Sequence, residues 1–128
     1  ASPPDMRLPI ALGLSWPERL AAVAPACDWT SAATWTFEPL DEETFPAVRL
    51  AREAVAASAT HPAVYNAANE ECVAAFLAGR IRFGDVVATV ERVLARHAGT
   101  PAADLDLDAV LAADAWARAA AREVLGAR

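Results

Sequence analysis

Alanine is the residue type that most constrains how this chain can fold. It recurs throughout the second half of the sequence and inflates the hydrophobic fraction, which reaches 55%. Alanine has the highest helix propensity of all residues, and large apolar side chains are comparatively few here. We therefore expect thin, closely packed helices rather than a deep core. A chain of 128 residues is most simply one domain, or one domain with the tail of a second.

Helical signals fill most of the chain beyond residue 42. Apolar residues recur at helical spacing from Val86 to Leu94, and Gly79 and Gly99 are expected helix ends. We expect a mainly α fold, with a roughly four-helix bundle preceded by a short helix between Pro9 and Pro17 and by a linker. The expected bundle helices begin near residues 45, 63, 84 and 114.

The residues Thr34–Phe37 alternate polar and aromatic side chains, a pattern that favours a β-strand. We therefore expect one short strand in the linker, containing Trp35 and Phe37. A single strand leaves its backbone groups unpaired, so its partner would belong to another chain or to a further part of the protein. The only methionine is Met6, which also favours a piece of a longer protein.

The charged residues exclude several classes of function. All eleven basic residues are arginine, so chemistry that depends on lysine, such as a Schiff base, is excluded within this chain. The net charge is −6 and the arginines are scattered among acids, so we expect no nucleic-acid partner. No apolar run approaches the length of a membrane span, so we expect no membrane partner. Cys27 and Cys72 are too few for a disulfide scaffold, which indicates free thiols and a cytoplasmic location.

The segment Asn66–Glu70 places polar side chains inside an expected helix. Asn66 and Glu70 begin a stripe that becomes apolar further along, and Asn69 lies on the same side. Asparagine is unfavourable in helix interiors, so two of them on a core-directed stripe indicate buried hydrogen bonds. The segment is either a ligand-binding pocket or a polar contact between the bundle and another segment. The second is favoured, because buried polar groups usually bond to protein.

No group of residues predicts catalysis. His61 lies in an expected loop without a neighbouring acid or nucleophile. His97 falls in the expected last turn of a helix, where positive charge is favourable and no further role is needed. We therefore expect no catalytic residue in this chain.

Two acidic runs deserve comparison with metal sites. Residues 41–43 precede a helix, where negative charge is favourable, and three adjacent carboxylates do not converge readily on one ion. Residues 104–108 alternate aspartate with leucine but lack the glycine and glutamate of a calcium loop. Asp106 or Asp108 is better explained as a helix cap, and Asp114 as the cap of the last helix. We expect no metal ligand here.

A series of motifs runs through nearly the whole chain. They are Pro4–Pro9, Trp16-Pro17, Trp35-Thr36-Phe37, Phe45-Pro46, Asn66–Glu70, Ala74–Leu77, Ile81–Phe83 and Asp114–Arg118. In order and spacing these motifs resemble 1-deoxy-D-xylulose 5-phosphate reductoisomerase. The run Asn-Ala-Ala-Asn-Glu followed by an apolar helix is the most specific of them.

The resemblance implies that this chain is the C-terminal part of a longer enzyme. That family is homodimeric and makes 2-C-methyl-D-erythritol 4-phosphate for non-mevalonate isoprenoid biosynthesis, using NADPH with magnesium or manganese. Residues 1–41 would be the end of the catalytic domain plus the linker, and residues 42–128 the C-terminal helical bundle. Its partners would be the N-terminal and catalytic domains of the same protein. The part represented here is expected to be inactive alone and to bind no cofactor.

By the same resemblance, Pro4 and Met6 match a segment near the nicotinamide and the substrate lid. Their role there would be apolar shaping, since a dry wall excludes water from hydride transfer. Residues 35–37 match the linker, and residues 66–70 the bundle, so both are expected to be structural. The alternative is a stand-alone helical interaction module derived from this family. A reading frame continuing upstream into a nucleotide-binding domain would exclude that alternative.

Overall fold

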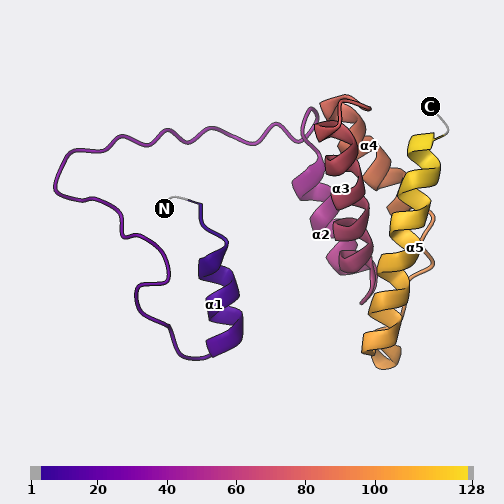
Figure 1. Cartoon of the computed structure of the whole chain (residues 1–128), viewed down its shortest axis with the longest axis horizontal. Coiled ribbons are helices and arrows are strands. Elements are labelled where there is room, and N and C mark those ends of the chain that lie inside the picture. Colours follow the sequence, from indigo (N-terminus) through magenta and orange to yellow (C-terminus); the bar gives the residue numbers. More distant parts are fainter. Residues whose placement is uncertain (1–3, 127–128) are drawn as a thin grey trace. The chain divides into compact units, whose positions relative to one another are not determined.

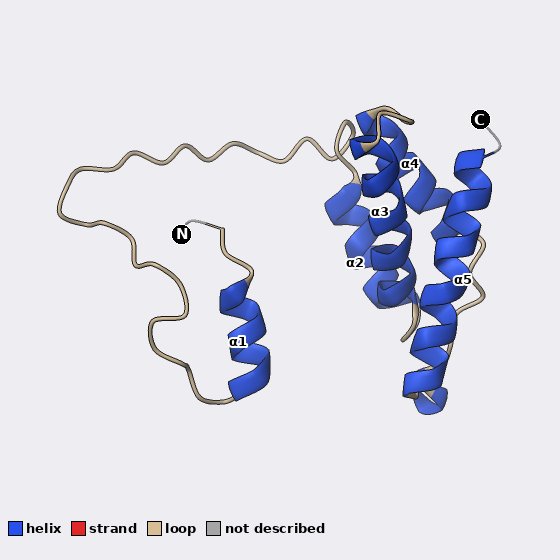
Figure 2. Cartoon of the chain, in the orientation of Figure 1, coloured by secondary structure: helices blue, strands red, loops and turns tan. Residues whose placement is uncertain are grey.

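The computed structural model describes residues 4–126, and every regular element within that range is helical (Figure 2). The expectation of a mainly α fold is therefore confirmed. The chain divides into two compact units, Ala1–Glu38 and Pro39–Arg128. The first contains one helix and the second contains four, with a short 3-10 turn before the last (Figure 1).

Helix α1, Arg7–Ser15, is the helix of the first unit. Pro9 occupies its first turn, where backbone N–H groups have no intrahelical acceptor and a missing one costs nothing. At the other end, the Ser15 hydroxyl lies 3.0 Å from the Ala11 carbonyl oxygen and 2.7 Å from that of Glu18. The predicted short helix is confirmed, beginning two residues before Pro9.

The predicted strand at Thr34–Phe37 is wrong. Residues 32–41 have no regular secondary structure, and Trp35 and Phe37 are 42% and 78% exposed. A strand is defined by the ladder that it forms with a neighbour, and no strand exists within residues 4–126. The alternation of polar and aromatic residues is present, but the described part of the chain offers it nothing to pair with.

The second unit is a bundle in which α3 contacts each of the other three helices (Figure 1). The helices are α2, Ala47–Ala57; α3, His61–Leu77; α4, Phe83–Leu94; and α5, Leu107–Gly126. The 3-10 turn η1 spans Ala102–Asp104. The Tyr65 hydroxyl fixes the start of α2 to α3 by donating to the Ala47 carbonyl oxygen at 3.1 Å.

Small side chains fill the core of the bundle, as the alanine content predicts. Valine is the largest apolar side chain among the described residues that are fully buried, and Leu50 is 4% exposed. The main core cluster consists of Val64, Ala67, Ala68, Cys72, Val86, Val90, Val93, Ala113, Ala117, Ala120, Ala121 and Val124. Cys27 and Cys72 form no disulfide with each other, and Cys72 is buried among these residues.

Several predicted helix ends were misplaced. His61 begins α3 rather than lying in a loop, because Pro62 is well tolerated in a helix first turn. Helix α5 begins at Leu107, and the Asp106 carboxylate caps it by accepting from the Ala109 N–H at 2.7 Å. Asp114, predicted to cap the last helix, lies within α5 instead. His97 follows the end of α4 by three residues.

None of the described helices combines the length and the apolar character that a bilayer crossing requires.

Candidate functional site

Pro4 and Met6 lie beside a local ion pair at the start of α1. The Asp5 carboxylate accepts from the Arg7 backbone N–H at 3.0 Å and from Arg7 Nε at 2.9 Å. These bonds hold the pKa of Asp5 down at about 2, so the pair stays charged at neutral pH. Pro4 is exposed and Met6 is 72% exposed. The pair gives the segment a defined backbone turn while leaving both apolar side chains open to contact.

The polar segment Asn66–Glu70 lies on the surface of the bundle, not in its core. Asn66 and Glu70 are both exposed, and Asn69 is half-buried. The Asn66 amide donates to the Glu70 carboxylate at 3.0 Å along the same helix. The expectation of a buried Asn66 amide is therefore wrong for this bundle. The core-facing stripe of α3 passes instead through Ala68 and Ala75.

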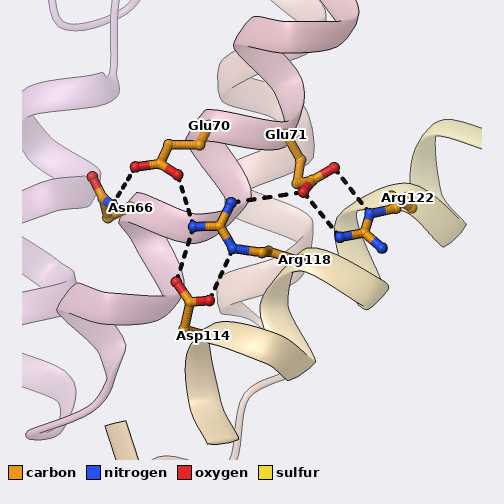
Figure 3. Close-up of polar contacts among 6 residues, drawn as sticks. All are labelled: Asn66, Glu70, Glu71, Asp114, Arg118 and Arg122. Atoms are coloured by element: carbon orange, nitrogen blue, oxygen red, sulfur yellow. Dashed lines mark hydrogen bonds and ion pairs between the residues drawn. The ribbon is translucent and has the colours of Figure 1, made fainter. Parts of the chain in front are cut away.

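Glu70 and Glu71 join α3 to α5 through two arginines, as Figure 3 shows. Arg118 donates to Glu70 Oε2 at 2.7 Å and to Asp114 Oδ2 at 2.8 Å, and lies 3.7 Å from Glu71. Arg122 donates to both oxygens of Glu71, each at 3.0 Å. We call these five charged residues the α3–α5 ion network.

The charges of the α3–α5 ion network are mutually satisfied. Hydrogen bonds from Arg118, then from Asn66, lower the pKa of Glu70 below its ordinary value. The Arg122 guanidinium does the same for Glu71, and Arg118 does so for Asp114. A carboxylate held ionised by arginine bonds is a poor proton donor or acceptor near neutral pH. The network is therefore suited to joining two helices rather than to catalysis.

A second polar cluster joins the α2–α3 turn to the segment after α4. His61 Nδ1 lies 2.7 Å from Ser58 Oγ, and His97 Nε2 lies 2.9 Å from Thr60 Oγ1. The two imidazole rings approach to 4.8 Å between centroids, nearly edge to face. We call these four residues the imidazole cluster. Thr60 is fully buried, and the other three are half-buried.

Backbone contacts tie the imidazole cluster to Thr100. The Thr100 N–H donates to Ser58 Oγ at 3.3 Å, and the Ala59 N–H donates to the Thr100 carbonyl oxygen at 3.1 Å. Gly99 adopts φ +80°, and a Cβ there would meet Ser58 Oγ at 2.7 Å. Only glycine accommodates both this backbone and this proximity.

Sequence reasoning missed the imidazole cluster because its partners are distant in the chain. Thr60 and His97 are 37 residues apart. The sequence signals were the two histidines themselves. His61 directly follows a Ser-x-Thr segment, and His97 lies two residues before Gly99. Each histidine has a sufficient local explanation, so no signal in the sequence indicates that the two lie close together.

The described residues contain no group of three or more His, Cys, Asp or Glu side chains arranged to hold a metal ion. Three neighbouring carboxylates, those of Glu70, Glu71 and Asp114, bond to the arginines of the α3–α5 ion network. The two histidines bond to hydroxyl groups rather than to further ligating side chains.

Comparison with known proteins identifies relatives along the whole chain. Residues 1–120 match the family described as the DXP reductoisomerase C-terminal domain. The 1-deoxy-D-xylulose 5-phosphate reductoisomerase of Arthrobacter sp. (strain FB24) is 61% identical over 125 residues, which cover 98% of this chain and 31% of the relative. That of Kitasatospora griseola is 60% identical over 126 residues, covering 97% of this chain and 32% of the relative.

A solved structure is similar over the same extent. The 1-deoxy-D-xylulose 5-phosphate reductoisomerase from Zymomonas mobilis, in complex with NADPH, matches with a TM-score of 0.72 and 42% sequence identity. The match covers 97% of this chain and 32% of that chain. The chain thus spans about a third of the length of these relatives.

Proposed function

The chain belongs to the 1-deoxy-D-xylulose 5-phosphate reductoisomerase family, and we propose that it forms the C-terminal part of such an enzyme. The reaction would convert 1-deoxy-D-xylulose 5-phosphate to 2-C-methyl-D-erythritol 4-phosphate with NADPH as reductant. The observation that carries this proposal is the continuous match of residues 1–120 to the C-terminal domain of the family.

Within that enzyme, the bundle acts as a structural support. The α3–α5 ion network and the core cluster hold α3, α4 and α5 together, and none of the network charges is left to take part in proton transfer. Residues 42–128 are the C-terminal bundle, and residues 1–41 are the end of the catalytic domain and the linker. The enzyme is a cytoplasmic homodimer, and the remaining domains of the same protein are the partners of this part.

Pro4 and Met6 are the residues of this chain that approach the reaction. NADPH supplies the hydride when bound, and magnesium or manganese is held by residues outside this chain. Met6 is open to contact, and the Asp5–Arg7 pair fixes the turn that presents it. Apolar groups beside a nicotinamide exclude water from the path of the hydride.

An NADPH oxidation assay tests the proposal. The purified 128-residue chain, given the sugar phosphate and manganese, is expected to oxidise no NADPH, whereas the complete enzyme oxidises it. Turnover by the isolated chain would overturn the structural role. A natural reading frame beginning directly before Ala1 would instead support the alternative of a stand-alone interaction module.

Substitution of Met6 tests its role within the complete enzyme. Met6→Asp introduces a charge at the proposed apolar wall and is expected to reduce kcat/KM by about tenfold or more. Met6→Leu keeps the volume and the apolar surface and is the matched control. Equal activity of both variants would remove Met6 from the site while leaving the role of the bundle intact.

A further inference from the structure

The imidazole cluster contains more hydrogen-bond donors than it can satisfy once a ring is protonated. The Ser58 oxygen accepts from the Thr100 N–H at 3.3 Å and from the Thr60 N–H at 3.4 Å. A hydroxyl has two acceptor lone pairs and one proton to donate. With both lone pairs engaged, the Ser58 proton is donated to His61 Nδ1, 2.7 Å away. Nδ1 is the acceptor in this arrangement, so a neutral His61 ring carries its proton on Nε2.

Protonation of His61 places a third donor against the Ser58 oxygen. Nδ1 then carries a hydrogen that points at Ser58 Oγ, and the Ser58 proton must turn to Thr60 Oγ1, 3.5 Å away. One of the backbone donors must be released for the imidazolium to bond. The Thr100 N–H is the one of these two donors that links Ser58 to the segment after α4, so its release removes one of the bonds that join the two loops.

Protonation of His97 would place a charge beside a buried hydroxyl. The Thr60 hydroxyl is fully buried, and it lies 2.9 Å from His97 Nε2 and 3.5 Å from Ser58 Oγ. Burial lowers the pKa of His97, and the adjacent His61 lowers it further. Two charged rings with centroids 4.8 Å apart would also repel each other.

The charged groups around the cluster do not compensate for these costs. Glu53 of α2 and Glu91 of α4 line the groove beside His61, but Glu53 bonds to Arg49 at 2.8 Å. From α5, the Trp116 ring packs against His97 with centroids 5.1 Å apart. Arg96, next to His97 in sequence, is paired with Glu123 of α5. Within the described residues, neither glutamate bonds to an imidazole.

We propose that the imidazole cluster is a pH-dependent contact, which joins the α2–α3 turn to the segment after α4 while both rings are neutral and releases it when they are protonated. The release exposes Thr60 and frees residues 95–101, which connect α4 to η1 and α5. This inference concerns the bundle itself and is independent of the reductoisomerase reaction.

Amide hydrogen exchange of the 128-residue chain tests the proposal. Because the pKa of His97 is lowered, the range must extend well below 6.5: between about pH 7.5 and pH 4.5, the protection factors of the Ala59 and Thr100 amides are expected to fall by about tenfold or more. The Arg80 amide, which donates to the Ala75 carbonyl oxygen at the end of α3, is the internal control and should keep its protection. Equal changes at all three amides, or none at Ala59 and Thr100, would overturn the proposal.

A double variant provides the matched control, because the chain has only two histidines. His61→Asn with His97→Gln keeps hydrogen-bonding groups at both positions but cannot become charged in this range. Its Ala59 and Thr100 amides should show no pH dependence, and persistence of the full change would overturn the proposal.

The nitrogen chemical shifts of the two imidazoles give a test that needs no variant. At neutral pH, His61 of the unmodified chain is expected to carry its proton on Nε2, as the Ser58 bonds require. A proton on Nδ1 of neutral His61 would contradict the arrangement from which the proposal follows.

Discussion

The two compact units contain helices of similar apolar character, but only one unit buries them. Helix α1 has leucine or isoleucine at four of its nine positions and no buried residue, whereas α3 buries five residues, three of which are alanine. Burial in this chain therefore depends on whether a helix has another helix to pack against, and not on the size of its side chains. An alanine facing another helix contributes to the core, and Leu14, which is 83% exposed, does not.

The two units also differ in the interactions that hold their elements in place. The first unit depends on short-range bonds, such as those of Asp5 with Arg7 and of Ser15 with Ala11. The bundle depends on contacts between helices distant in sequence, and the α3–α5 ion network spans 48 residues between Glu70 and Arg118. Substitutions in the two units should therefore have very different effects on stability.

The largest expected effect is loss of core volume in the bundle. Val93→Ala removes two methyl groups from a fully buried site and should lower the free energy of unfolding by about 2–3 kcal/mol. Leu14→Ala in α1 removes more atoms but should cost about 0.5 kcal/mol or less, because Leu14 is exposed. Chemical denaturation followed by circular dichroism measures both. A larger loss of unfolding free energy for Leu14→Ala than for Val93→Ala would contradict this difference between the two units.

A backbone substitution should rank second. Gly99→Ala forces alanine into φ +80° and brings its Cβ to 2.7 Å from Ser58 Oγ, so we expect a loss of about 2 kcal/mol. Gly84→Ala, in α4, meets no atom within 4 Å and is the matched control. Thermal unfolding of the two variants separates a local requirement for glycine from a general effect of added side chains. Equal melting temperatures would contradict the geometry at Gly99.

One buried group weakens the bundle, and its removal should stabilise it. The Thr89 hydroxyl lies on the buried face of α4 and has no hydrogen-bond partner. Thr89→Val replaces it with a methyl group of similar size and should raise the free energy of unfolding by about 1 kcal/mol. Thr89→Ser, which keeps the hydroxyl and loses the methyl group, should destabilise. Stabilisation by serine would mean that the hydroxyl is satisfied.

The smallest effect concerns the surface charges of the bundle. The lowered pKa of Glu71 means that its ionised form is favoured by folding, so the stabilisation is present above the ordinary pKa of 4.5 and is lost as the pH falls through the lowered value. Arg122→Gln should reduce this acid dependence of the melting temperature. An Arg7→Gln variant serves as the control from the first unit. The pairs are exposed, so added salt should weaken the difference.

Periodicity predicted the valine face of α4 because its apolar residues are large and regularly spaced. The same reasoning failed for α3, where it selected the stripe containing Asn66, Val73 and Leu77. That stripe is exposed, and a stripe through Ala68 and Ala75 is buried instead. Alanine gives a weak hydrophobic signal, yet it is favoured where helices approach closely. Two competing stripes on one helix cannot be ranked without knowing the neighbouring helix.

Polar contacts could likewise be predicted where the partners are close in sequence, and not where they are distant. Asp106, one of the two predicted caps with Asp108, does cap α5, and the N–H group that it bonds lies only three residues away. Asp114 is not a cap, because its carboxylate accepts from Arg118, one turn further along α5. The bond between Thr60 and His97 requires the approach of two loops, which the order of residues does not encode locally. The strand predicted at Trp35 does not form, because its alternating pattern has no strand to pair with among residues 4–126.

The central position of α3 has a consequence for how the protein is made. Synthesis proceeds from the N-terminus, so α2, α3 and α4 are complete before α5. Until α5 arrives, the face of α3 that packs against Ala117 and Ala121 has no cover, and Glu70 and Glu71 lack their arginines. That face is largely alanine, which is weakly adhesive compared with leucine or phenylalanine. This small-residue face of α3 thus offers little that other unfolded chains can bind.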